Sequence, residues 1–312
     1  MRNLFLTLAC VTCLATLSVQ AQSPHRSTEN SPLWEVHLDL QKAFSSPLGQ
    51  WVLEKFAEEE PDKLEHITKF AEAIGIDPRT DIGEIVLFGN GFDETDATVI
   101  VNLGQSTGNL EGWFLAAPGY RSENIDDDTL LHSMTLEDQD ARIWLALPKH
   151  PQQGNYFLIG SFDEERTAKL VRQALAGSYL SPVIVPLQDD TLFSFFVNDL
   201  SAVPFDIDSN DPGSAVVRTI EQLGLQVASD DDHLSVTLDL SASSAGKARQ
   251  ISQLLTGLKA MMQLAPLDEP EVQKLGTILE SLVIKHTEGE SSVQASLSAP
   301  YQLLEELVSE ID

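Results

Sequence analysis

Cysteine is almost absent from this chain of 312 residues, which contains only two. Both of them, Cys10 and Cys13, lie in an apolar N-terminal segment that we expect to be removed from the mature protein. A mature chain without cysteine has no disulfide bond, no thiol nucleophile and no cysteine-ligated metal. Its stability must therefore come from hydrophobic burial, and about 290 residues are enough for one large core or two smaller ones.

Basic residues are also scarce. The chain has 19 Lys and Arg against 48 Asp and Glu, which gives a formal net charge of -29. A charge of this sign repels nucleic-acid phosphate and anionic lipid, so we expect the protein to bind neither. We interpret the acidity as a solvated surface, and a preference for divalent or basic partners or an adaptation to salt are the alternatives.

Long apolar runs are limited to one, from Leu4 to Leu17. Arg2 precedes this run and Val19-Gln20-Ala21 follows it as a small-residue cleavage site, which predicts a secretory signal peptide over residues 1–21. The run is shorter than the ~20 residues that a membrane-spanning helix needs, although an uncleaved anchor helix is the alternative. We therefore predict a soluble, exported protein, periplasmic or extracellular, with a flexible polar leader over residues 22–32.

Motifs for nucleophilic catalysis and phosphate binding are missing from the sequence. Ser161 follows Gly160, but the second glycine of a nucleophile elbow is absent, and no Gly-x-Gly-x-x-Gly or phosphate-binding loop occurs. The seven histidines lack the paired spacing of zinc sites. We place His37 and His66 on exposed faces and His286 in a strand. The prediction is that the chain has no catalytic residue, no cofactor and no metal ligand.

Acidic clusters are frequent, and each has a structural interpretation. Asp206-Ile-Asp208-Ser-Asn210 resembles the start of a calcium loop, but Asp211 stands where that loop has glycine, and the final glutamate is missing. We interpret Asp211 as a helix cap, and the acids at Asp126–Asp128 and Asp230–Asp232 as turn residues. An ion cluster of Asp77, Arg79 and Asp81 would brace a turn in the same way.

Hydrophobic periodicity predicts a first α+β half over residues 33–177. Trp34, Val36 and Leu38 alternate with polar residues, which is typical of a strand with one buried face. One helix is expected to have Pro47 near its first turn. A second is expected to start after Pro61 and to end at Gly75. The other expected elements are strands over 85–88, 98–103, 129–135, 141–147 and 156–160, a short helix over 108–117, and a helix that begins at Asp163 and ends at Gly177.

A linker is predicted over residues 178–190, and a second α+β half over residues 191–312. The apolar strand at 192–197 is expected to be buried. The other expected elements are a helix from 211 to 223, a hairpin over 225–240, helices over 243–264 and 270–281, strands over 282–286 and 292–297, and a last helix from Pro300.

The order β-α-β-β-α-β-β-α fits both halves, with one extra strand in the first. The closest local echo is Val99–Gly104 against Val236–Ser241, each of which follows an acidic turn. We therefore predict an α+β fold of two related halves, with largely antiparallel sheets and helices packed on one face. The alternative is that unrelated α+β halves share this coarse order.

Several motifs of the first half form a recognisable set: Gly75-Ile-Asp-Pro-Arg-Thr-Asp-Ile82, the strand Ile85–Gly89, Leu110-Glu-Gly-Trp113, Pro118-Gly-Tyr120 and the Asp163 helix. With these motifs, most of residues 33–177 resembles a group of uncharacterised exported proteins of planctomycete-type bacteria. The resemblance implies an exported compartment and a two-part α+β body. It implies no activity, cofactor or catalytic residue.

Together these features favour a non-enzymatic binding or structural module of the periplasm or cell envelope, with a protein or an envelope component as its partner. One alternative is a hydrolase or glycan-active enzyme that uses carboxylates, since such chemistry needs no sequence signature. The other alternative is an acidic module that depends on calcium.

Overall fold

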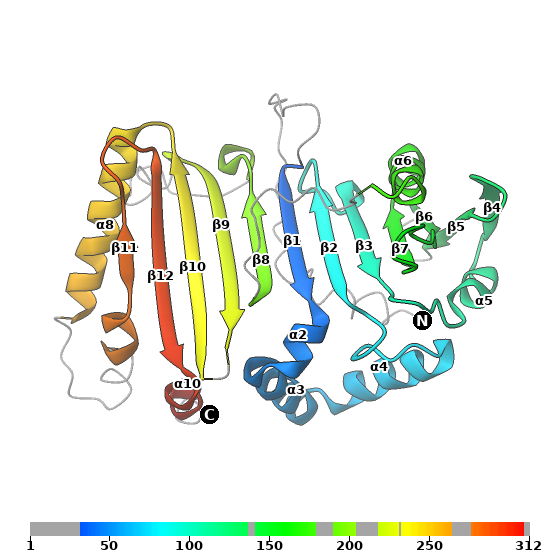
Figure 1. Cartoon of the computed structure of the whole chain (residues 1–312), viewed down its shortest axis with the longest axis horizontal. Helices are drawn as coiled ribbons and strands as arrows, with labels where there is room; N and C mark the ends of the chain where they lie inside the picture. Colours follow the sequence, from blue (N-terminus) through cyan, green and yellow to red (C-terminus); the bar gives the residue numbers. More distant parts are fainter. Residues whose placement is uncertain are drawn as a thin grey trace. The chain divides into compact units, whose positions relative to one another are not determined.

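The computed structural model describes residues 32–136, 141–178, 190–203, 218–230, 232–263 and 276–308. The predicted signal peptide, most of the predicted leader and linker, the calcium-like segment Asp206–Asn210 and the predicted cap Asp211 lie outside these ranges. The described residues form two compact units, a first unit up to residue 178 and a second from residue 190; the short stretch Ser46–Leu48 groups with the second unit. The protein is an α+β protein, and its strands pair antiparallel (Figure 1).

The first unit contains a sheet in the order β1-β2-β3-β7-β6-β5-β4. Every pairing in it is antiparallel. Its strands are β1 (Trp34–Asp39), β2 (Glu84–Gly89), β3 (Ala97–Asn102), β4 (Arg121–Asn124), β5 (Leu130–Leu136), β6 (Ala141–Ala146) and β7 (Phe157–Ser161). Strand β4 was not predicted, because its four residues are all exposed and carry no apolar pattern; it is defined by its pairing with β5.

The helices of this unit are α2 (Leu40–Ser45), α3 (Pro47–Glu59), α4 (Pro61–Ile74), α5 (Leu110–Leu115) and α6 (Glu164–Leu175), with a 3-10 turn η2 (Glu94–Asp96). Helices α3 and α4 begin at prolines and α4 ends before Gly75, close to the predicted bounds. Gly75 ends α4 with a left-handed φ of 69°, and Asp163 caps α6 by accepting the backbone N–H of Arg166. Helix α2 was not predicted: Leu40 begins a helix instead of extending β1.

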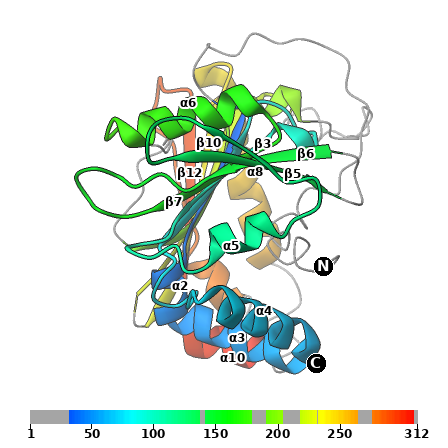
Figure 2. The ribbon, with the colours of Figure 1, turned by 90° about the vertical axis from the view of Figure 1, so that its right-hand side faces the viewer.

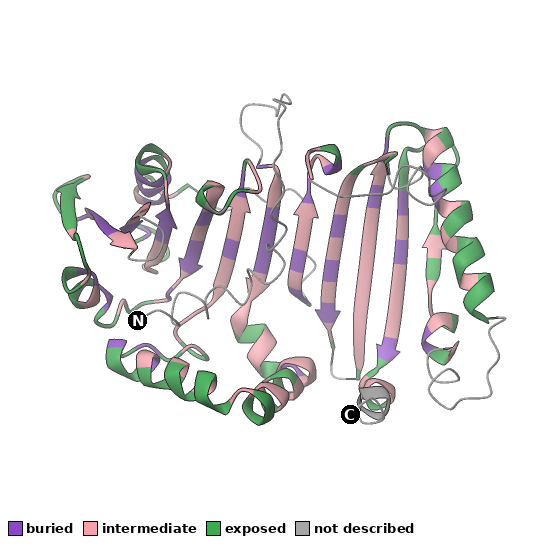
Figure 3. Cartoon of the chain, turned by 180° about the vertical axis from the view of Figure 1, so that it is seen from behind, coloured by how far each residue is buried: buried purple, intermediate pink, exposed green. Residues whose placement is uncertain are grey.

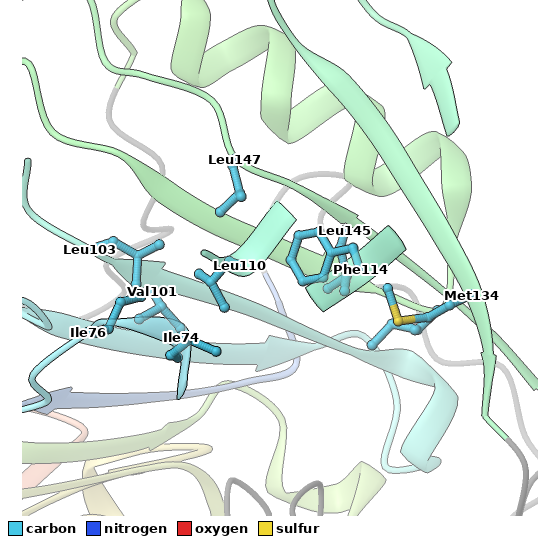
Figure 4. Packing of buried hydrophobic residues seen from close by; sticks show 10 residues of the cluster. Ile74, Ile76, Val101, Leu103, Leu110, Phe114, Met134, Leu145 and Leu147 are labelled. Carbon is cyan, nitrogen blue, oxygen red and sulfur yellow. The ribbon is translucent and has the colours of Figure 1, made fainter. Parts of the chain in front are cut away.

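Helices cover both faces of the first sheet (Figure 2). On one face, register places Val86, Ile100 and Ile159 in one row, and α6 packs over that row through Val171 and Ala174. On the other face, a second cluster joins α5 and the end of α4 to the sheet; Figure 4 shows it. The prediction of helices on one face is therefore wrong for this unit, because α5 brings its own apolar stripe to the opposite side of the sheet.

The second unit contains a sheet in the order β8-β9-β10-β12-β11. Its strands are β8 (Thr191–Val197), β9 (Ile220–Ser229), β10 (His233–Ala242), β11 (Val283–Lys285) and β12 (Ser292–Pro300). The 3-10 turn η3 (Leu200–Ala202) follows β8, the helix α8 (Ala245–Gln263) follows β10, and the helix α10 (Tyr301–Val308) follows β12. The predicted helix over 211–223 is wrong at its end, where residues 220–223 begin β9. Leu223, Leu225 and Val227 alternate with polar or small residues, which is the period of a strand.

Alternation divides the second sheet into an apolar face and a polar face. Val236, Leu238 and Leu240 of β10 point to the apolar side, and α8 packs through Ala248 and Ile251 against the C-terminal end of β10, next to Leu240. Thr237 of β10 lies on the polar side. In β8 the expected burial holds for Leu192 and Val197, whereas the three phenylalanines are half-buried. Of the helices within the described residues, none is long and apolar enough to cross a membrane.

Removing the centre of the first core tests this packing. Ile159 is fully buried between β3, β6 and α6, so we expect Ile159→Ala to lower the free energy of unfolding by about 3 kcal/mol, through lost burial and a residual cavity. Leu115→Ala, at a side chain that is 63% exposed, is the control and should change it by no more than about 0.5 kcal/mol. Urea denaturation measures both, and equal effects would contradict the packing described.

Candidate functional site

Three titratable side chains meet on β1 and β2. Glu35 and His37 are two residues apart on β1, so they share one face of the sheet. The register pairs His37 with Val86 and Asp39 with Glu84, which places the Glu84 carboxylate diagonally opposite the imidazole. Sequence positions 35, 37 and 84 therefore meet because of strand pairing.

His37 is held between two carboxylates. Its Nδ1 lies 2.7 Å from Oε1 of Glu84, and its Nε2 is hydrogen-bonded to Oε1 of Glu35. His37 and Glu35 are 4% and 2% exposed, whereas the side chain of Glu84 is partly exposed. The prediction that His37 lies on an exposed face is wrong. Alternation shows which residues share a face, but it does not show that the polar face of β1 is also covered.

The two carboxylates fix the charge of His37. Burial by itself would lower the pKa of His37, but the hydrogen bonds that its ring donates to Glu35 and Glu84, together with the negative charges of these two residues, outweigh this effect and raise the pKa to about 9. The ring is therefore an imidazolium at neutral pH, with each ring nitrogen donating to a carboxylate. An imidazolium of this kind is neither a general base nor a metal ligand, and the cluster acts as an ion-paired brace between β1 and β2.

The other histidines have individual environments. His132 of β5 is buried, its Nδ1 lies 3.0 Å from the hydroxyl of Tyr120, and burial lowers its pKa, a shift that the charge of Glu111 only partly opposes. His66 is exposed on α4, as predicted. His286 follows the end of β11 and its Nδ1 lies 2.9 Å from the carbonyl of Ser292. Within the described ranges, no group of three or more His, Cys, Asp or Glu side chains is arranged to hold a metal ion.

Ser161, the serine considered for a nucleophile elbow, is a buried structural residue. Its hydroxyl donates to the carbonyl of Asp163 at 2.8 Å and lies 2.7 Å from the hydroxyl of Thr167. These contacts hold the first turn of α6 against the end of β7. Ser161 therefore has a structural role at this junction.

Three acidic groups form turns through the backbone. Oδ1 of Asp77 accepts the N–H of Arg79, and Oδ2 of Asp81 accepts the N–H of Asp77. Asp126 and Asp230 each accept two backbone N–H groups from residues two and three positions on. The hydrogen bonds from Asp232 and His233 also lower the pKa of the Asp230 carboxyl. These contacts are those expected of turn residues.

A hollow lies on the polar face of the second sheet. Register aligns Gln226, Thr237 and Ser296 across β9, β10 and β12, and Ala228, Ser235 and Ser298 form the next row. The hollow is about 320 Å³, and its polar lining consists of Asp190, Gln226, Ser235, Thr237, Ser281, Ser296 and Ser298. The hollow could not be predicted from the sequence, because its serines and threonine lie on strands far apart in the chain and converge only through the strand register.

No protein-family model matches the chain, and no curated protein matches it either. Among solved structures, the chain is similar to crystal form IV of TP0453, with a TM-score of 0.47 and 10% sequence identity over 90% of this chain and 94% of that one. Crystal form III of the same protein gives a TM-score of 0.43, also at 10% identity, over 90% and 95% of the two chains. Likeness at this level carries no argument about function.

The brace at His37 makes stability depend on pH. The folded protein keeps the His37 proton up to about pH 9, whereas an unfolded chain releases it near pH 6.5. The stabilisation is therefore complete below pH 6.5 and is lost as the pH rises through 9, by roughly 3 kcal/mol in total. Urea denaturation from pH 6 to 10 measures this loss.

His37→Gln should remove the pH-dependent fall between pH 6.5 and 9, whatever it does to stability at any single pH. His66→Gln is the matched control, since His66 is exposed and its replacement should leave the fall unchanged. The same pH dependence in the wild type and in His37→Gln would show that His37 is not the group responsible.

Proposed function

We propose that this chain is an exported, non-enzymatic binding protein of the periplasm or cell envelope, and that it binds a neutral, hydroxylated envelope component at the hollow of its second unit. The lining chemistry of the hollow carries this proposal. Export rests on the predicted signal peptide over residues 1–21.

The lining suits a ligand that is rich in hydroxyl groups. Five side-chain hydroxyls and the amide of Gln226 can each donate and accept hydrogen bonds, and Asp190 adds an acceptor. The described lining includes no Lys or Arg, so an anionic ligand would find no counter-charge there. The volume of about 320 Å³ is at the lower end of the range for small-ligand sites, about 300–1,000 Å³. A sugar unit of an envelope glycan fits these requirements.

Two observations favour binding over catalysis. Hydrolysis of a glycosidic bond uses a pair of carboxylates that flank the bond, and Asp190 is the one carboxylate in the described lining of the hollow. The carboxylates that do converge, Glu35 and Glu84, both bond to the imidazolium of His37. Their arrangement supports a structural role for that cluster.

A common origin of the two units is part of this proposal. The order β1-β2-β3-β7-β6 in the first sheet matches the order β8-β9-β10-β12-β11 in the second, strand for strand. In both units a helix follows the third strand of this order, α5 or α8, and another follows the fourth, α6 or α10. Strands β4 and β5 are then an insertion in the first unit. Duplication followed by divergence would leave helices on both faces of the first sheet and a polar hollow on the second.

Co-sedimentation with insoluble peptidoglycan sacculi tests the proposed function. We expect residues 22–312 to sediment with the sacculi in a saturable way and to leave the glycan intact. Ser296→Trp places a large side chain in the hollow and should weaken this binding at least about tenfold, or roughly 1.4 kcal/mol.

The matched control is Ser292→Trp, on the same strand and the same face but outside the hollow lining, and it should bind as the wild type does. Release of reducing sugar would favour the hydrolase alternative, and loss of binding in a chelator would favour the calcium-dependent one. Unchanged binding by Ser296→Trp would contradict the placement of the site.

A further inference from the structure

The turn between β2 and β3 begins with the dipeptide Asn90-Gly91, and no other asparagine of the sequence is followed by glycine. Asn90 is exposed, and Figure 3 shows this turn in the colours of exposed and intermediate residues. Neither the Asn90 side chain nor the backbone N–H of Gly91 makes a hydrogen bond to a described residue. The amide of Asn90 is therefore open to solvent and to its own backbone.

Packing explains why glycine stands at position 91. A Cβ there would collide with Oδ2 of Asp96, at the other end of the turn. The carbonyl of Gly91 accepts the indole N–H of Trp34 at 2.7 Å. The indole ring also lies against Gly89, where a Cβ would be 2.8 Å from Cε2 of Trp34. The turn thus depends on two residues without side chains, and it holds the first residue of β1.

Asparagine is thermolabile because its side chain can react with the backbone that follows it. Gly91 has no side chain to obstruct this approach, so its amide nitrogen can attack Cγ of Asn90. The nitrogen loses its proton and bonds to Cγ, the bond from Cγ to Nδ2 breaks, and ammonia leaves a succinimide ring. Water then opens the ring at either carbonyl. One opening gives aspartate, and the other gives isoaspartate, whose backbone is longer by one methylene.

Two asparagines further along the chain lack this combination of features. Oδ1 of Asn102 accepts the backbone N–H of Gly104 at 3.0 Å, and a leucine follows Asn102. Asn109 is exposed, as Asn90 is, but a leucine follows it too. A branched side chain on the following residue obstructs the approach of its nitrogen to Cγ. Exposure and glycine coincide at Asn90.

From these features we propose that Asn90 is a site of spontaneous covalent modification, and that its conversion to isoaspartate releases Trp34 from the turn. The additional methylene displaces the carbonyl of Gly91, which holds the indole N–H in the unmodified protein. Both products also add a carboxylate to a turn that already contains Asp93 and Asp96, and these like charges repel one another. The reaction needs water and no enzyme or cofactor.

Peptide mapping tests the site, after incubation of folded residues 22–312 at mildly alkaline pH. Trypsin releases residues 80–121 as one peptide, which contains Asn90 and, as internal controls, Asn102 and Asn109. We expect Asn90 to lose its amide at least about tenfold faster than either control. Labelling with an isoaspartate methyltransferase and S-adenosylmethionine then measures the isoaspartate fraction.

NMR of the indole N–H groups tests the consequence for Trp34. The Trp34 signal, assigned by its loss in Trp34→Phe, should move as isoaspartate accumulates. Asn90→Gln is the matched control, because it keeps an amide whose longer side chain does not close the succinimide ring. Its Trp34 signal should stay unchanged over the same incubation. The proposal is overturned if Asn90 keeps its amide as long as Asn102 does, or if isoaspartate forms and the Trp34 signal does not move.

Discussion

A chain with 48 acidic and 19 basic residues can bury a carboxylate only where a cation or several hydrogen bonds accompany it. This constraint is met on β1, where the imidazolium of His37 bonds to the carboxylates of Glu35 and Glu84. The arrangement ties the first strand of the first unit to its neighbour. A buried carboxylate left without such a partner would cost several kcal/mol, a large part of the stability of a typical domain.

The same constraint explains where the remaining acids lie. The carboxylates of Asp77, Asp126 and Asp230 accept backbone N–H groups in exposed turns, where water screens their charge. Because the charges lie at the surface or are paired, the buried core clusters of both units consist of aliphatic residues, Met134 and Phe114. The residues that the structure describes include no cysteine, so their stability depends on these cores and on antiparallel strand pairing.

Short-range sequence patterns predicted the helices and strands whose bounds are set by residues a few positions away. Gly75 ends α4, Asp163 caps α6 and the β-branched run at 98–101 forms β3, because each depends on residues a few positions away. The burial of His37 and the hollow beside Thr237 could not be predicted in this way. Both depend on strand register and on what covers a sheet face, and neither property is local. Strand β4 was not predicted for a related reason: it is defined by its pairing with β5 and has no apolar pattern.

The His37 cluster lies in the interior of the first unit, and the polar hollow lies on a face of the second sheet. The cluster of His37, Glu35 and Glu84 holds β1 and β2 together, whereas the hollow of the second sheet is lined by hydroxyl and amide groups that no core uses. In the proposed function, the interior supplies the stable frame on which the polar hollow of the second unit is displayed.

The most direct test of this account is the protonation state of His37, measured from its imidazole nitrogen shifts by NMR in the folded protein between pH 5 and 10. The account predicts a doubly protonated ring throughout the neutral range, with a midpoint near pH 9. A midpoint at or below 6.5 would mean that His37 is available as a base at neutral pH. In that case the cluster with Glu35 and Glu84 would have to be treated as a candidate catalytic site.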